Sequence, residues 1–148
     1  MSDPLYKKEL LRLAADATGA GRLAVPCGSA TVHNPACGDK ITIDIAVVDE
    51  RVAAIAHLTT ACVLTQASAA ILGGGCVGLS KAELVNLHRS VSAMLEGGSA
   101  PGEPFAIYST FDGVTEFSSR HRCVLLPIEA ALAAIEASER GEPGGVGT

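Results

Sequence analysis

Three separated cysteines and one aspartate are the residues of this chain whose types and spacing could do chemistry. Cys37 and Asp39 lie in the run Asn-Pro-Ala-Cys-Gly-Asp (residues 34–39), Cys62 follows Thr-Thr-Ala, and Cys123 follows Arg-His-Arg. Three thiolates and one carboxylate suit either a tetrahedral zinc ion or a thiolate-held iron–sulfur cluster. If the fold gathers these four side chains, the chain contains a metal or sulfur site.

The local sequence around each of these three cysteines is compatible with a ligand or a reactive thiol. Gly38 permits a tight turn that can aim Cys37 and Asp39 into one pocket. Cys62 and Cys123 each stand at the expected start of a helix, where the positive end of the helix dipole stabilises a thiolate, and basic residues precede Cys123. The alternative is that each cysteine packs in the core, because cysteine is among the most buried residue types.

The remaining cysteines and the histidines have weaker settings. We expect Cys27 and Cys76 to be packing residues or exposed reduced thiols. His88 falls on an expected amphipathic helix, where a packing or surface role is commoner than metal binding. His57 could face the site, and His121 is the better reserve ligand.

Length, charge and composition exclude several classes of protein. The 148 residues suffice for one domain with its own core, and no apolar run reaches the roughly 18 residues of a membrane-spanning helix. A net charge of -5 with only two tyrosines and three phenylalanines argues against a nucleic-acid partner. Five cysteines and a start without an export signal favour reduced thiols and a cytoplasmic location. We therefore expect neither a nucleic-acid nor a membrane partner.

Alternating apolar and polar residues predict a small sheet. The predicted strands cover residues 29–33, 41–47 and 52–58, and the turn at Asp49 and Glu50 joins the last two as an antiparallel hairpin. Such a sheet must lay its apolar face on helices. The expected fold class is therefore α+β, a small three-stranded antiparallel sheet packed on helices.

Helical periodicity accounts for most of the remaining sequence. The predicted helices cover residues 5–17, 62–72, 80–95 and 124–137. Ser80 and Glu83 are spaced as a capping box, and Pro127 is tolerable only in the first turn of the last helix. A looser connection at 101–115 carries Phe105, Tyr108 and Phe111, which could cover the core or form a partner surface. We expect a single domain over residues 1–140 and a flexible tail over 141–148.

These motifs resemble those of the U-type iron–sulfur assembly proteins, which include IscU, the amino-terminal domain of NifU, and SufU. Residues 34–39 match the family's first-cysteine motif without a mismatch. Ala61 and Cys62 are followed by Gln-Ala-Ser at 66–68, and Arg-His-Arg-Cys stands at 120–123. The resemblance runs from about Leu5 to Ser138 and implies a SufU/IscU-like fold.

The chain looks most similar to the SufU branch of that family. Residues 96–118 look like the SufU-type insertion, and Arg122 stands where IscU-like members have a histidine. The chain also lacks a Leu-Pro-Pro-Val-Lys chaperone motif. Two residues depart from the family pattern: Ala61 replaces a glycine, and Ile128 replaces a larger residue. Neither departure removes a ligand.

The resemblance implies a sulfurtransferase-like protein that takes persulfide sulfur from a SufS-like cysteine desulfurase and serves downstream iron–sulfur assembly proteins. It implies that Cys37, Asp39, Cys62 and Cys123 bind zinc, that Cys37 accepts the sulfur, and that Arg120 supports the site or the partner. One alternative is a scaffold on which an iron–sulfur cluster is assembled and passed on. Another is a protein whose metal only stabilises the fold.

Overall fold

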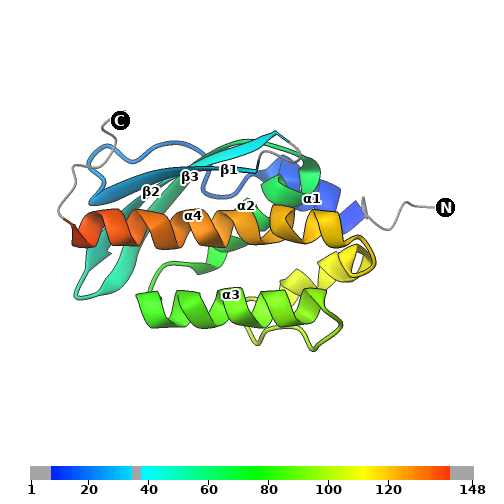
Figure 1. The fold of residues 1–148 in the computed structure, drawn as a ribbon. Coiled ribbons are helices and arrows are strands. Elements are labelled where there is room, and N and C mark those ends of the chain that lie inside the picture. The colour runs from blue at the N-terminus through cyan, green and yellow to red at the C-terminus, as the bar shows by residue number, and fades with distance from the viewer. Residues whose placement is uncertain (1–7, 35–37, 141–148) are drawn as a thin grey trace.

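The fold is a three-stranded antiparallel sheet packed on helices (Figure 1). The computed structural model describes residues 8–34 and 38–140, so Cys37, the first residues of the first predicted helix and the predicted tail at 141–148 lie outside the described residues. The strands pair in the order β1-β2-β3, with bounds β1 (Gly28–Asn34), β2 (Asp39–Val48) and β3 (Arg51–Thr60). The predicted α+β class is confirmed.

Alternation along β2 decides which side chains enter the core. Ile41, Ile43 and Ile45 are each at most 1% exposed and belong to the hydrophobic core. Because successive side chains of a strand point to opposite faces, Asp39 begins this same inward row. Asp49 and Glu50 form the turn to β3 with positive φ angles of 52° and 64°, as two-residue hairpin turns require. The predicted hairpin is confirmed.

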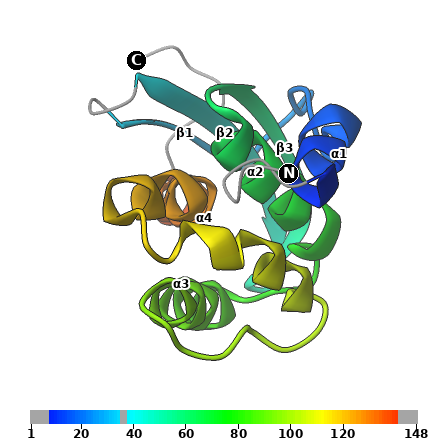
Figure 2. The same cartoon turned by 90° about the vertical axis from the view of Figure 1, so that its right-hand side faces the viewer.

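Most of the helices lie in two layers beneath the sheet, the first helix lies beside it, and two 3-10 turns connect the last two long helices. Their bounds are α1 (Lys8–Asp16), α2 (Val63–Gly75), α3 (Lys81–Leu95), η1 (Ala106–Val114), η2 (Ser118–Arg120) and α4 (His121–Glu139). Helix α4 lies against β1 and β2, and α3 packs on the other side of α4 (Figures 1 and 2). A Cβ atom at Gly28 would lie 2.1 Å from the carbonyl oxygen of Ala134, so the close approach of β1 to α4 requires glycine there.

Helix α3 begins with the predicted capping box. The Ser80 hydroxyl accepts a hydrogen bond from the Glu83 N–H (3.2 Å), and the Glu83 carboxylate accepts one from the Ser80 N–H (3.0 Å). The two bonds satisfy amide groups that the first turn of a helix leaves without helical partners. Among the described residues, no helix combines the length and the apolar character needed to cross a bilayer.

The segment between α3 and α4 is more ordered than the sequence predicted. It contains η1 and η2, and Phe105, Tyr108 and Phe111 are at most 5% exposed, with the Tyr108 ring between the other two at centroid distances of 6.2 and 5.8 Å. These rings therefore cover the core. Because η2 runs directly into α4, this helix begins at His121 instead of residue 124, and Pro127 lies inside the helix instead of in its first turn.

A partly buried ion pair lies on the outer face of the sheet. The chain between α1 and β1 pairs with the edge of β3, where the Gly21 N–H donates to the His57 carbonyl (2.8 Å). The same segment brings Arg22 to Asp44, whose side chain is fully buried, and the guanidinium donates two hydrogen bonds to the carboxylate. In the sequence, Asp44 is one of the polar residues that alternate with the isoleucines of the strand. Its burial was therefore not predicted.

Candidate metal centre

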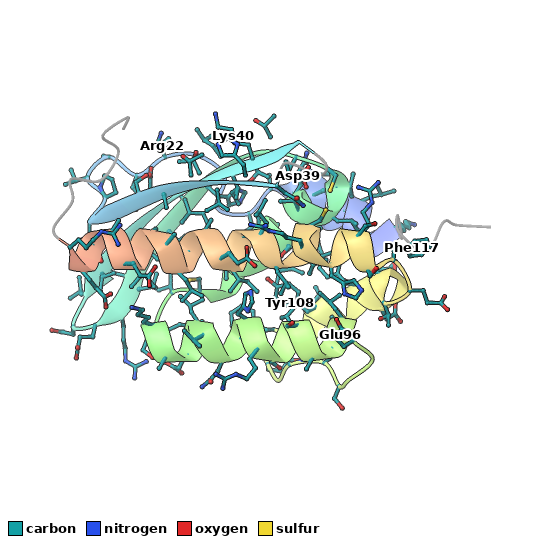
Figure 3. All side chains as sticks on the ribbon, in the orientation of Figure 1. Arg22, Asp39, Lys40, Glu96, Tyr108 and Phe117 are labelled. Carbon is teal, nitrogen blue, oxygen red and sulfur yellow. The ribbon has the colours of Figure 1, made fainter. Side chains whose placement is uncertain are left out.

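Asp39, Cys62 and Cys123 meet at one end of the sheet. One ligand atom from each lies within 4.8 Å of the other two. Asp39 opens β2, Cys62 stands between β3 and α2, and Cys123 lies in the first turn of α4. Figure 3 shows Asp39 at this end of the sheet, with sulfur atoms beside it. Because β2 and β3 are antiparallel, the start of one strand adjoins the end of the other, and three element ends meet here.

Hydrogen bonds from α2 hold the Asp39 carboxylate in place. Oδ1 accepts the backbone N–H of Cys62 (3.0 Å), and Oδ2 accepts the hydroxyl of Thr65 (2.6 Å). Cys62 is the N-cap residue of α2 and makes no capping bond with its own side chain. Asp39, which is 2% exposed, therefore places a carboxylate at the positive end of this helix, where a negative charge is stabilised.

The two sulfur atoms have different environments. Cys123 is fully buried, and the Asn34 amide donates a weak hydrogen bond to its Sγ (4.0 Å), whereas Cys62 is only half-buried. The pKa of the Cys62 thiol is lowered to about 6, first by a hydrogen bond from Cys123 and then by Thr65, against the opposing effects of burial and of the Asp39 carboxylate. Cys62 is therefore largely a thiolate at neutral pH, and one side of the site is accessible.

The distance between one sulfur and one carboxylate oxygen suits two ligands of the same metal ion. The Cys62 sulfur lies 3.3 Å from Asp39 Oδ2. Tetrahedral zinc with bonds of about 2.3 Å to sulfur and about 2.0 Å to oxygen would separate such ligands by about 3.5 Å. A thiolate and a carboxylate this close repel each other unless a proton or a cation lies between them. Two sulfurs and one carboxylate oxygen thus form a donor set suited to a thiophilic divalent cation.

Comparison with known proteins identifies the family. The chain matches the sequence profile of the family described as NifU-like N terminal domain over residues 5–124. The chain belongs to this family. The crystal structure of a nitrogen-fixing NifU-like protein (N-terminal) from Brucella abortus shares 33% identity and a TM-score of 0.87, over 93% of this chain and 96% of that one.

Two further relatives resemble this NifU-like domain. The iron–sulfur cluster assembly scaffold protein IscU of Streptococcus pyogenes serotype M1 is 27% identical over 112 residues, which are 75% of this chain and 70% of that protein. A protein from Fervidobacterium islandicum AW-1, described as a scaffold for the SUF system, has a TM-score of 0.82 at 18% identity. That match covers 91% of this chain and 99% of the other, and it shows likeness of fold.

His57 does not join the candidate metal ligands of this NifU-like domain. Its Nε2 donates to the carbonyl of Thr18 (2.9 Å), so its Nδ1 accepts the hydroxyl of Thr59 (2.9 Å). Burial lowers the pKa of His57, although the bond to Thr18 opposes this shift, and the ring is neutral at pH 7. Both ring nitrogens are occupied, so the expectation that His57 could face the site is wrong.

His121 is also turned away from the sulfur atoms. Its Nε2 lies 3.1 Å from each of the carbonyl oxygens of Val114 and Thr115, to which it donates, and its Nδ1 lies 3.7 Å from a carboxylate oxygen of Glu96. The ring fastens the start of α4 to the end of η1. The expectation of a reserve ligand at this position is therefore wrong, whereas the contact of His88 with Glu129 (3.1 Å) agrees with its expected packing or surface role.

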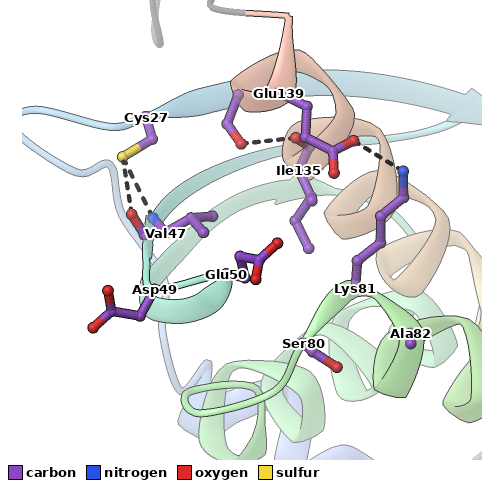
Figure 4. Close-up of a pocket in the computed structure, with 10 residues that line it drawn as sticks. Cys27, Val47, Asp49, Glu50, Ser80, Lys81, Ala82, Ile135 and Glu139 are labelled. Carbon is purple, nitrogen blue, oxygen red and sulfur yellow. Dashed lines mark hydrogen bonds and ion pairs between the residues drawn. The ribbon is translucent and has the colours of Figure 1, made fainter.

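The other cysteines lie apart from the cluster. Cys76 is fully buried, and burial raises the pKa of its thiol to about 12, which confirms the predicted packing role. Cys27 is exposed beside a cavity of about 590 Å³ at the hairpin end of the sheet, where its sulfur accepts the Val47 N–H (3.4 Å) (Figure 4). The same cavity contains the ion pair between Lys81 and Glu139 (2.9 Å), and it lies at the opposite end of β2 from Asp39.

Two arginines, Arg120 and Arg122, precede Cys123 in the sequence. Arg122 lies 3.5 Å from the carboxylate of Glu129. Arg120 is half-buried, and its backbone N–H donates to Phe117 (2.8 Å). The role of Arg120 in supporting the site or a partner therefore stays a prediction.

Sequence reasoning missed two polar residues at the centre, Asn34 and Thr65. Asn34 stood inside the first-cysteine motif, and Thr65 follows Cys62 by three residues, a spacing that places both on one face of a helix. Gly38, with φ of 73°, donates its N–H to the Asn34 carbonyl (2.9 Å), so the connection from β1 to β2 is closed at its ends by a hydrogen bond. Cys37 belongs to that connection by sequence and lies outside the described residues.

Proposed function

We propose that this NifU-like domain is a zinc-dependent sulfur acceptor in iron–sulfur cluster assembly. The observation that carries the proposal is the convergence of Asp39, Cys62 and Cys123, with a spacing suited to zinc and with Cys37 two residues before Asp39 in the sequence. The printed name of the Streptococcus relative supports the general process of cluster assembly. The sulfur would come from a SufS-like cysteine desulfurase and pass to downstream assembly proteins in the cytoplasm.

The proposal gives Cys37 two roles, as a zinc ligand and as the sulfur acceptor. Zinc bound to Cys37, Asp39, Cys62 and Cys123 would keep the thiols deprotonated at neutral pH. In the transfer step, the Cys37 thiolate attacks the terminal sulfur of a persulfide on the desulfurase. A new S–S bond forms to Cys37, the old S–S bond breaks, and the desulfurase cysteine leaves as a thiolate. The proton remains with the transferred sulfur, so no external oxidant or reductant is consumed.

The surroundings of α4 support the SufU-like branch. Arg122 takes the place of the histidine of IscU-like members, and the imidazole of His121 is engaged by carbonyl groups of the preceding segment. The described part of the chain thus offers a carboxylate and two thiols at the centre with no imidazole among them. Such a donor set favours tight zinc binding, with Cys37 as the fourth ligand.

The test measures sulfur transfer and metal content on the full chain. With a SufS-like desulfurase and cysteine, we expect faster desulfurase turnover and a mass increase of one sulfur on the peptide that contains Cys37. Cys37→Ala should abolish both effects. Cys27→Ala, which removes an exposed thiol far from the centre, is the matched control and should change neither. Unchanged turnover together with no persulfide on Cys37 would refute the proposal.

A second candidate is the scaffold on which a cluster is assembled. The name of the Streptococcus relative favours it, and thiolates are the usual ligands of iron–sulfur clusters. Anaerobic reconstitution distinguishes the two functions. A stable cluster that passes to an apo-acceptor, with no zinc in freshly purified protein, would establish the scaffold and overturn the sulfur acceptor.

A further inference from the structure

Thr65 touches two of the three described metal-site residues without being a ligand itself. Its hydroxyl donates to Asp39 Oδ2 at 2.6 Å, and its Oγ1 lies 3.6 Å from the sulfur of Cys62. Thr65 is fully buried. Buried hydroxyl groups are normally hydrogen-bonded. The partner of the Thr65 hydroxyl is the Asp39 carboxylate, 26 residues earlier in the chain.

The start of α2 leaves the Thr65 hydroxyl free to make this contact. A threonine inside a helix commonly bonds its hydroxyl to the carbonyl four residues earlier, which here belongs to Ala61. That carbonyl instead accepts the side-chain amide of Gln66 (2.7 Å). The Thr65 proton can therefore be directed to Asp39, to which it makes one of the shortest side-chain hydrogen bonds of the centre.

Two donors at the start of α2 restrain both oxygens of the Asp39 carboxylate. The Cys62 N–H holds Oδ1 (3.0 Å), and the Thr65 hydroxyl holds Oδ2 on the side that faces the sulfur of Cys62. A carboxylate held by one donor can rotate about its Cβ–Cγ bond, whereas a carboxylate held at both oxygens cannot. Outer hydrogen bonds of this kind orient metal ligands and typically change metal affinity by about 10- to 100-fold.

We infer that Thr65 is a positioning residue that orients Asp39 for metal binding. The inference rests on the metal site of the proposed function but not on sulfur transfer. In this inference the hydroxyl of Thr65 holds Oδ2 toward the ion, and the volume of its side chain does not matter. Removal of the hydroxyl should weaken binding only while Asp39 is present.

The experiment measures the affinity of the full chain for Zn²⁺ by competition with a chromophoric chelator. Thr65→Val keeps the shape of the side chain and removes the hydroxyl, and we expect about 10- to 100-fold weaker binding. Thr65→Ser restores the hydroxyl and should recover most of the affinity. In an Asp39→Ala background, Thr65→Val should cause no further loss. Thr59→Val, which removes a hydroxyl bonded to His57, is the matched control and should bind as the wild type does.

The absorption spectrum of bound Co²⁺ provides a second measurement. It would not change if Thr65 only stabilised the fold. The d–d absorption bands of Co²⁺ depend on ligand geometry, so Thr65→Val should shift them while Thr65→Ser keeps the wild-type spectrum. If valine prevents folding, as circular dichroism of the metal-free protein would reveal, Thr65→Ala compared with Thr65→Ser repeats the test.

The outcomes separate this inference from the proposed function. Wild-type affinity and spectrum in Thr65→Val, with binding lost in Asp39→Ala, would overturn the role of Thr65 and leave the metal site intact. An additional loss caused by Thr65→Val in the Asp39→Ala background would also overturn it, because Thr65 would then act elsewhere. If the Thr65 variants change Zn²⁺ affinity as expected but the protein accepts no sulfur, the inference is supported and the proposed sulfur acceptor is refuted.

Discussion

Arg22→Ala should destabilise the fold through Asp44, a carboxylate outside the metal centre. Asp44 accepts hydrogen bonds from the guanidinium of Arg22 (2.9 Å for Nη2), from the Ser29 hydroxyl (2.6 Å) and from the Leu23 N–H (3.1 Å). Burial would raise the pKa of Asp44, but these bonds, led by that of Arg22, outweigh burial and hold the pKa below its ordinary value. The alanine variant leaves a fully buried carboxylate with fewer donors.

The expected size of the effect follows from the exposure of the two partners. A hydrogen bond to a charged group contributes about 1.5–3 kcal/mol, and loss of one partner of a buried pair costs more than that. The Arg22 side chain is 42% exposed, so water screens its charge and the upper end of the range does not apply. We expect the free energy of unfolding to fall by about 2 kcal/mol at pH 7, or about 4–8 °C in Tm for a domain of this size.

The pH dependence of this contribution has a definite sign. The pKa of Asp44 is lower in the folded state than the unfolded value of about 3.9. Its stabilising contribution is therefore complete above about pH 5 and is lost as the pH falls through the unfolded and then the folded pKa, because the unfolded state takes up the proton first. Since Arg22→Ala raises the folded pKa, the difference between wild type and variant should shrink as the pH falls from 5 to 3.

Urea unfolding of the metal-free protein at several pH values tests this reasoning. Arg51→Ala is the matched control, because Arg51 pairs with Glu83 at 2.8 Å and both side chains are about half exposed. The control should shift the urea midpoint much less than Arg22→Ala at pH 7. A midpoint unchanged by Arg22→Ala at pH 7, or a difference from wild type as large at pH 3 as at pH 7, would refute the assignment.

Two further predictions concern thiols and the segment before α4. In metal-free protein, the rate of alkylation of Cys62 should rise with pH around a midpoint near 6, because its bonds to Cys123 and Thr65 lower its pKa to that value. Cys76, with a pKa of about 12, should not react until the protein unfolds. Peptide mass spectrometry measures both, and equal reactivity of the two thiols would contradict the site geometry. His121→Ala should lower stability by about 1 kcal/mol and speed amide exchange in residues 106–114 while Zn²⁺ affinity stays unchanged; a loss of Zn²⁺ would restore His121 as a ligand candidate.

The sheet and three members of the site could be predicted because short-range patterns encode them. The alternation of isoleucines along β2 requires one buried face, and the turn at Asp49 and Glu50 limits the pairing of β2 with β3, whose register shifts once, between Ala46 and Val47. That register brings the start of β2 beside the end of β3. The candidate ligands stand at element ends, so correct elements sufficed to place Asp39 beside Cys62.

Apart from those of Asn34 and Thr65, the contacts that were not predicted from the sequence involve segments without a periodic pattern. The covering of Asp44 depends on the irregular chain between α1 and β1, which brings Arg22 across the sheet. The direction of His121 depends on the carbonyl groups at the end of η1, and the early start of α4 depends on η2. The spacing of residues within one helix or strand does not predict such contacts, because the partner residues come from other segments of the fold.

Asp39 and Asp44 of strand β2 point to opposite faces of the sheet because successive side chains of a strand alternate. Asp39 shares the inward row of Ile41, Ile43 and Ile45, so the same pleat that buries the isoleucines directs its carboxylate toward α2 and α4. Asp44 stands in the opposite row and is neutralised on the outer face by Arg22. A slip of one residue between β2 and its neighbours would exchange the two faces. It would place the isoleucines in water and remove Asp39 from both cysteines at once, so the hydrophobic core and the metal centre depend on one register.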